Sequence, residues 1–90
     1  MAFVIAYELR SAAPDRGLEE ELTRIKAIRV FDSVWRYFER DPMDPHEMLR
    51  RLLPFINMRE DRLWIVNTLG EGAINNPLES YEIACRESGH

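Results

Sequence analysis

The segment FVIAYEL, residues 3–9, most constrains the fold of this chain. In an extended strand, successive side chains point to opposite faces of the sheet. The first set is Phe3, Ile5, Tyr7 and Leu9, and the second set is Val4, Ala6 and Glu8. Because both sets are largely apolar, the segment is typical of a strand that is covered on both sides. We therefore expect residues 3–9 to form the central strand of a sheet.

The bulk properties indicate one small globular domain. The chain has 90 residues, of which 46% are hydrophobic and 31% charged. We treat residues 1–90 as a single domain, with a core at about 2–69 and a C-terminal appendage at about 70–90. Its single cysteine excludes an intrachain disulfide. The first apolar run is too short for a signal peptide or a membrane span, so we expect a cytoplasmic protein.

Periodicity and capping signals predict the remaining elements of the core. Leu18, Leu22 and Ile25 repeat at helical spacing, with an acidic first turn at 19–21. Asp44, Pro45 and Glu47 form a capping-box pattern. Pro54 should kink or tighten the second helix. The expected elements are a helix at about 16–26, strand at 27–39, a helix from Pro45 to about Asn57, and a strand at 62–69. Two strands joined at Asp32-Ser33 are preferred for 27–39, and a single kinked strand is the alternative.

Beyond residue 69 the pattern changes. Gly70 and Gly72 interrupt it, and Asn76, Pro77 and Glu79 repeat the capping signal, which predicts a short helix at about 77–85. The order of elements is β-α-β-β-α-β plus this appendage. The fold class is therefore α+β, a ferredoxin-like domain with a four-stranded antiparallel sheet, two helices on one face and a short C-terminal helical appendage.

Two helices cover only one face of such a sheet, so the second face needs a partner. We expect it to carry Val4, Ala6, one aromatic set from 34–38 and either Trp64 and Val66 or Leu63 and Ile65. The preferred interface set is Val4, Ala6, Trp35, Tyr37, Trp64 and Val66. Exposed apolar patches of several hundred Å² are unusual on monomers. A homodimer that buries this face is the preferred interpretation, and a C-terminal segment folded over the face is the alternative.

Glu8 is the candidate functional residue on that second face. Two copies of Glu8 at a dimer axis could share a divalent cation such as Mg²⁺ or Mn²⁺, or repel each other and raise the pKa of one of them. Alternatively, Glu8 lies at the rim and pairs with Arg10, Arg36 or water. Arg10 and Arg36 are also the candidate residues for binding nucleic acid, although the formal net charge of −4 disfavours a protein wrapped in nucleic acid.

Several segments carry a family resemblance. They are VIAYEL, FDSVWRYF and MLRRLLPFINMREDRLWIV. In their order and lengths they resemble the small ferredoxin-like proteins related to the CRISPR adaptation subunit (the Cas-two family) and to virulence-associated protein D, and more closely the bacterial SinR-like group. The resemblance covers about residues 3–69.

The resemblance implies a homodimer with facing sheets. In the nuclease members an Asp ends the first strand and binds a divalent metal, and Glu8 occupies that position here. Because Glu is one methylene longer and Mg²⁺ requires near-ideal geometry, we expect weak or no catalysis. The preferred hypothesis is thus a homodimeric binding or scaffold module that partners with protein, RNA or DNA. The alternatives are a metal-dependent endoribonuclease or nuclease using Glu8 of both subunits, and a small-ligand regulatory domain.

Overall fold

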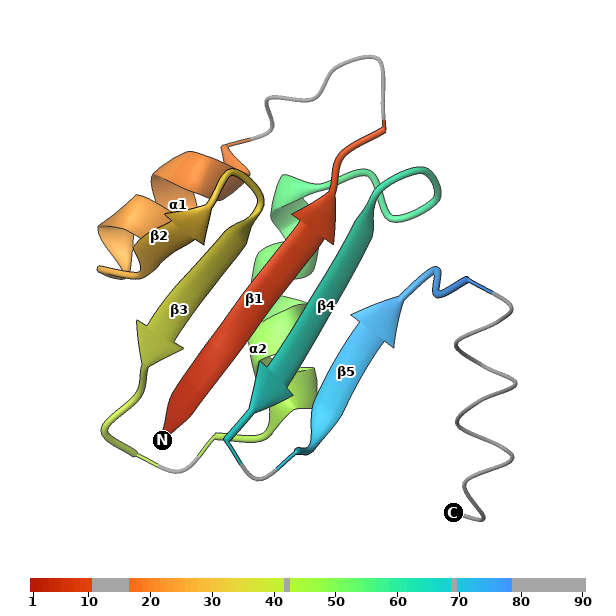
Figure 1. The fold of residues 1–90 in the computed structure, drawn as a ribbon. Coiled ribbons are helices and arrows are strands. Elements are labelled where there is room, and N and C mark those ends of the chain that lie inside the picture. The colour runs from red at the N-terminus through yellow and green to blue at the C-terminus, as the bar shows by residue number, and fades with distance from the viewer. Residues whose placement is uncertain (11–16, 42, 69, 79–90) are drawn as a thin grey trace, which may run out of the picture.

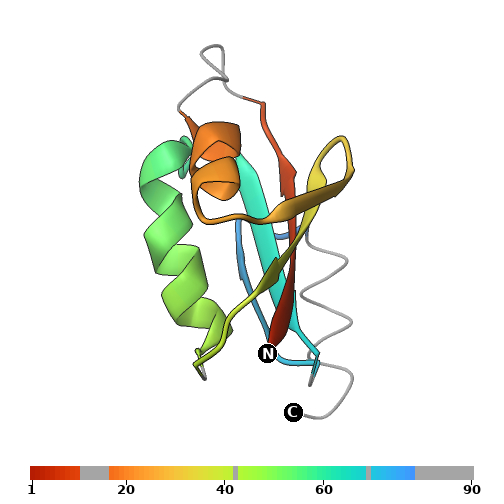
Figure 2. The same ribbon diagram turned by 90° about the vertical axis from the view of Figure 1, so that its left-hand side faces the viewer.

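The computed structural model describes residues 1–10, 17–41, 43–68 and 70–78. One antiparallel sheet carries two helices on one face (Figures 1 and 2). The strands are β1 (Ala2–Glu8), β2 (Ile28–Phe31), β3 (Val34–Phe38), β4 (Arg62–Asn67) and β5 (Gly72–Asn75). The helices are α1 (Leu18–Arg24), α2 (Pro45–Leu52) and the short 3₁₀ helix η1 (Leu53–Phe55). No helix in the described ranges is long and apolar enough to cross a membrane.

The sheet has five strands in the order β2-β3-β1-β4-β5, with β1 at its centre as expected. The α+β class is confirmed, but the prediction of four strands is wrong. Gly72, interpreted as an interruption, instead opens β5, which pairs with β4. A Cβ at Gly72 would lie 3.1 Å from the carbonyl oxygen of Ile65, so glycine suits this close approach of the two backbones.

The start of the helix predicted at 77–85 is not helical in the structure. Asn76, its expected N-cap, has a left-handed φ of 50°. An N-cap residue ordinarily has an extended backbone. Pro77 and Leu78 are not helical, and residues 79–85 lie outside the described residues.

The other local signals agree with the structure. Asp44 caps α2, and its side chain accepts a hydrogen bond from the His46 backbone N–H at 2.9 Å. The α-helix gives way to η1 around Pro54, because proline cannot supply an α-helical N–H. Residues 27–39 form two strands joined by a turn at Asp32-Ser33 rather than one kinked strand.

The core lies between the sheet and the helices. Phe3, Ile5 and Tyr7 point into it, as the alternation in residues 3–9 predicts. The two helices and β4 complete the core with Leu18, Leu22, Met48, Leu52, Leu63 and Ile65. We call the opposite side, which the helices do not cover, the outer face.

The prediction that Trp35 and Tyr37 lie on the outer face is wrong. In the β1–β3 pairing, Ile5 is opposite Trp35 and Phe3 is opposite Tyr37. Directly opposed residues of an antiparallel pair share a face. Both aromatic side chains therefore point toward the helices, where Trp35 is buried and Tyr37 stacks on Phe3 at a ring separation of 6.5 Å.

Candidate functional site

Glu8 ends β1 on the outer face, where two arginines hold its carboxylate. Arg62, its cross-strand neighbour on β4, donates from Nη1 to Glu8 Oε2 at 3.2 Å. Arg10 Nε lies 3.7 Å from Oε1. The structure thus shows the ion-paired alternative, with Arg62 as a partner that sequence reasoning did not name. Arg36, by contrast, is opposite Val4 on β3 and is not brought to Glu8.

The surroundings of Glu8 in one chain do not fit a metal centre. Within the described residues, no group of three or more His, Cys, Asp and Glu side chains could hold a metal ion. The nearest charged groups, Arg10 and Arg62, are cationic and would repel Mg²⁺ or Mn²⁺. A second copy of Glu8 could add a carboxylate here, but each copy would bring two arginines with it.

The outer face is broad and apolar. Val4, Ala6, Trp64 and Val66 lie on it, as predicted, because each is out of phase with the buried residues of its strand. Strand pairing adds Ile28, Phe31, Val34, Phe38 and Ile74. Among these, Phe38 is 66% exposed, Val4 43% and Trp64 40%. Arg36 stands within this apolar surface beside Val4.

A shallow hollow of about 150 Å³ opens at one end of the outer face. Its lining includes Ala6, Trp64 and Ile74 from three adjacent strands, with Glu8 and Arg62 at the polar end. It is mostly apolar and the size of a side chain rather than of a cofactor. Phe38 protrudes near the opposite end of β1, where it is paired with Ala2.

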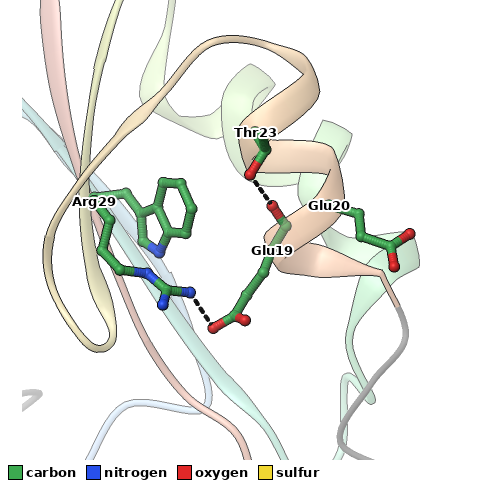
Figure 3. A pocket seen from close by; sticks show the side chains of 5 residues that line it. Glu19, Glu20, Thr23 and Arg29 are labelled. Carbon is green, nitrogen blue, oxygen red and sulfur yellow. Dashed lines mark hydrogen bonds and ion pairs between the residues drawn. The ribbon is translucent and has the colours of Figure 1, made fainter.

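A second hollow, of about 570 Å³, lies on the helix-covered side between α1 and β2 (Figure 3). Figure 3 shows Arg29 reaching from β2 to Glu19 on α1, while Glu20 points away from both. The Arg29 guanidinium also lies over the Trp35 ring, 4.7 Å from its centroid. Glu19 and Arg29, two of the charged residues that line this hollow, are therefore already paired with each other.

Hydrogen bonds connect this ion pair to the core. Trp35 Nε1 donates to the Tyr7 hydroxyl at 3.1 Å, and that hydroxyl donates to Glu19 Oε2 at 2.9 Å. Burial raises the pKa of Tyr7, while the hydrogen bond from Arg29 and then that from Tyr7 lower the pKa of Glu19. Arg29 covers the Trp35 ring and is paired with Glu19. The network therefore holds α1 against the sheet rather than presenting reactive groups.

This network predicts a pH-dependent contribution to stability. A carboxyl whose folded pKa is lowered stabilises the fold above its unfolded pKa, and the contribution is lost as pH falls through the folded value. Glu19→Gln should therefore be less stable than wild type at neutral pH, by about 1 kcal/mol, and the gap should close below about pH 4. Urea unfolding at several pH values measures it. The neighbour Glu20→Gln is the control, and an equal effect of both variants at neutral pH would contradict the prediction.

Asp61 is a buried residue that sequence reasoning did not identify. The side chain is only 1% exposed. Its Oδ1 accepts from the Arg10 backbone N–H at 2.7 Å, and its Oδ2 accepts from the Asn57 backbone N–H at 2.8 Å. Asp61 therefore joins the end of β1 to the turn before β4. An acid in a polar turn carries no sequence signal for such a distant contact.

Scans of the chain against protein-family models, curated proteins and solved structures found no match. The functional argument therefore depends on the geometry described above.

Proposed function

We propose that this protein is a small homodimeric binding or scaffold module that associates through the outer face of its sheet. The observation that carries the proposal is the apolar surface on β1, β3 and β4 that the described helices leave open. Its exposed members include Val4, Phe38 and Trp64. Burying such surface contributes about 25 cal/mol of free energy per Å². This contribution would stabilise a domain that is marginal alone.

A second copy suits this face because its features complement each other. An isologous dimer brings the same surface of two subunits together. Phe38 protrudes near one end of the face, and the hollow beside Trp64 and Ile74 opens near the other. A twofold axis between them would let each Phe38 enter the hollow of the other subunit. Anchors seated in pockets dominate the energy of many interfaces.

The proposal includes a ferredoxin-like core. Strands β1 to β4 follow the order β2-β3-β1-β4 with every neighbouring pair antiparallel, and both helices lie on one face (Figure 2). Strand β5 then extends this core beside β4. The proposal retains the resemblance to the Cas-two-like and SinR-like group, and with it a cytoplasmic protein that partners with other macromolecules.

Catalysis at Glu8 is not part of the proposal. A metal-dependent nuclease needs carboxylates free to bind the ion. The Glu8 carboxylate is instead paired with Arg10 and Arg62. Labelled RNA and duplex DNA are incubated with the protein in Mg²⁺ or Mn²⁺, with and without EDTA, and the same is done with Glu8→Ala. We expect no cleavage that depends on both the metal ion and Glu8. Cleavage with both dependences would contradict this part of the proposal.

The tryptophans offer a test of association. Trp35 is buried in the core, whereas Trp64 is 40% exposed on the outer face. In a dimer, acrylamide should reach neither ring well, and dilution should expose Trp64 alone. We expect the quenchable fraction of fluorescence to rise as the protein is diluted, with unchanged circular dichroism. A quenchable fraction independent of concentration would contradict association through this face.

A further inference from the structure

A third hollow, which shares Arg62 with the hollow on the outer face and is separate from the α1 network, lies where the ends of β1, β4 and β5 meet. Its volume is about 320 Å³, and its lining is Arg10, Arg59, Glu60, Arg62 and Asn76. Three arginines thus line one space. We propose that this hollow binds a single phosphate group, either free phosphate or the terminal phosphate of a small molecule.

The backbone around the hollow is held in place. Asp61 fixes the Arg10 and Asn57 backbone N–H groups. The side-chain amides of Asn75 and Asn76 donate to the Asp61 carbonyl at 2.9 and 3.1 Å. The turn before β4 and the end of β5 are therefore locked together, so the arginines start from an ordered frame. Preorganisation of this kind reduces the cost of binding.

The three arginines retain unused donors. Among the described residues, the Arg59 guanidinium has no hydrogen-bond or ion-pair partner. Arg10 Nε lies 3.7 Å from Glu8, beyond hydrogen-bond distance. Arg62 donates from Nε to the Asn76 carbonyl at 3.0 Å and from Nη1 to Glu8, which orients its remaining nitrogen. Guanidinium forks match phosphate oxygens in paired hydrogen bonds.

The charge balance favours one phosphate over a nucleic-acid backbone. Three arginines face Glu60 in the hollow and Glu8 at its edge, which leaves a small local excess of positive charge. The chain as a whole carries a formal charge of −4. An extended polyanion would meet the negative charge of the whole chain along its length, whereas a phosphate dianion would meet only the small positive excess at the hollow.

Titration calorimetry at low salt and about pH 7.5, where phosphate monoesters are dianionic, tests the proposal. The probes are inorganic phosphate, adenosine monophosphate, adenosine and a duplex DNA without terminal phosphates. We expect the first two to bind with dissociation constants of about 1 mM or below, and adenosine not to bind. If neither inorganic phosphate nor adenosine monophosphate binds at concentrations several times the expected dissociation constant, the proposal is overturned. Stronger, Arg59-dependent binding of the duplex would instead assign the site to a nucleic-acid backbone and equally overturn it.

Variants make the site assignment specific. Arg59→Gln should weaken phosphate binding about tenfold, the loss of about one charge-assisted hydrogen bond. Glu8→Gln should strengthen binding, because it removes a carboxylate that competes for Arg10 and Arg62. Arg50→Gln, on the exposed side of α2, changes the net charge equally and should have no effect. Equal weakening by Arg50→Gln and Arg59→Gln would show a nonspecific charge effect and contradict the site.

Discussion

Replacing Asp61 by asparagine should lower the free energy of unfolding by about 2–4 kcal/mol. The two carboxylate oxygens accept backbone N–H groups from Arg10 and Asn57 in a buried setting. An asparagine has one acceptor oxygen, so its NH₂ group would face one of these donors. The loss is large because a domain of this size is stable by only roughly 5–13 kcal/mol.

Urea unfolding of wild type, Asp61→Asn and Glu60→Gln at neutral pH measures this effect. Glu60 is the adjacent residue and is exposed, so its variant should lie within about 0.5 kcal/mol of wild type. If Asp61→Asn were as stable as Glu60→Gln, the buried carboxylate would not hold the end of the sheet together. The frame proposed for the phosphate hollow would then also lose its basis.

The second large effect is expected at Val4, near the centre of the outer face. Val4→Glu should raise the dissociation constant of the dimer at least about 100-fold, because an interface core tolerates an added carboxylate poorly. The monomer should remain folded. Val4 is 43% exposed, and its neighbour Arg36 can pair with the new carboxylate across the strands.

Sedimentation velocity over a range of concentrations measures the change, and circular dichroism checks the fold. Arg50→Gln on α2 alters the net charge by the same amount on the opposite side of the molecule and should leave the dimer intact. Dimerisation of Val4→Glu with wild-type affinity would place the contact surface elsewhere.

Sequence reasoning located the central strand and the phase of its faces, because residues 3–9 place the larger apolar side chains on one face and the smaller ones, with Glu8, on the other. The same reasoning failed on β3. In VWRYF, residues 34–38, apolar side chains fall on both faces, so alternation alone leaves the phase open. The pairing of Ile5 with Trp35 decides it, and such a register depends on the whole sheet.

Strand β5 and Asp61 escaped prediction for a related reason. The four residues Gly72–Asn75 have little strand signal of their own, and their pairing with β4 defines them. The buried Asp61 carboxylate accepts a hydrogen bond from the Arg10 backbone N–H, which lies 51 residues away in the chain. Glu8 was located correctly at the end of its strand, but its partner Arg62 became evident only through the β1–β4 register.

The mass of the wild-type protein in solution tests the central claim most directly. Sedimentation equilibrium at micromolar to millimolar concentration should give twice the 10.6 kDa of one chain. A mass of one chain throughout that range would contradict the proposal that a second copy covers the outer face of the sheet.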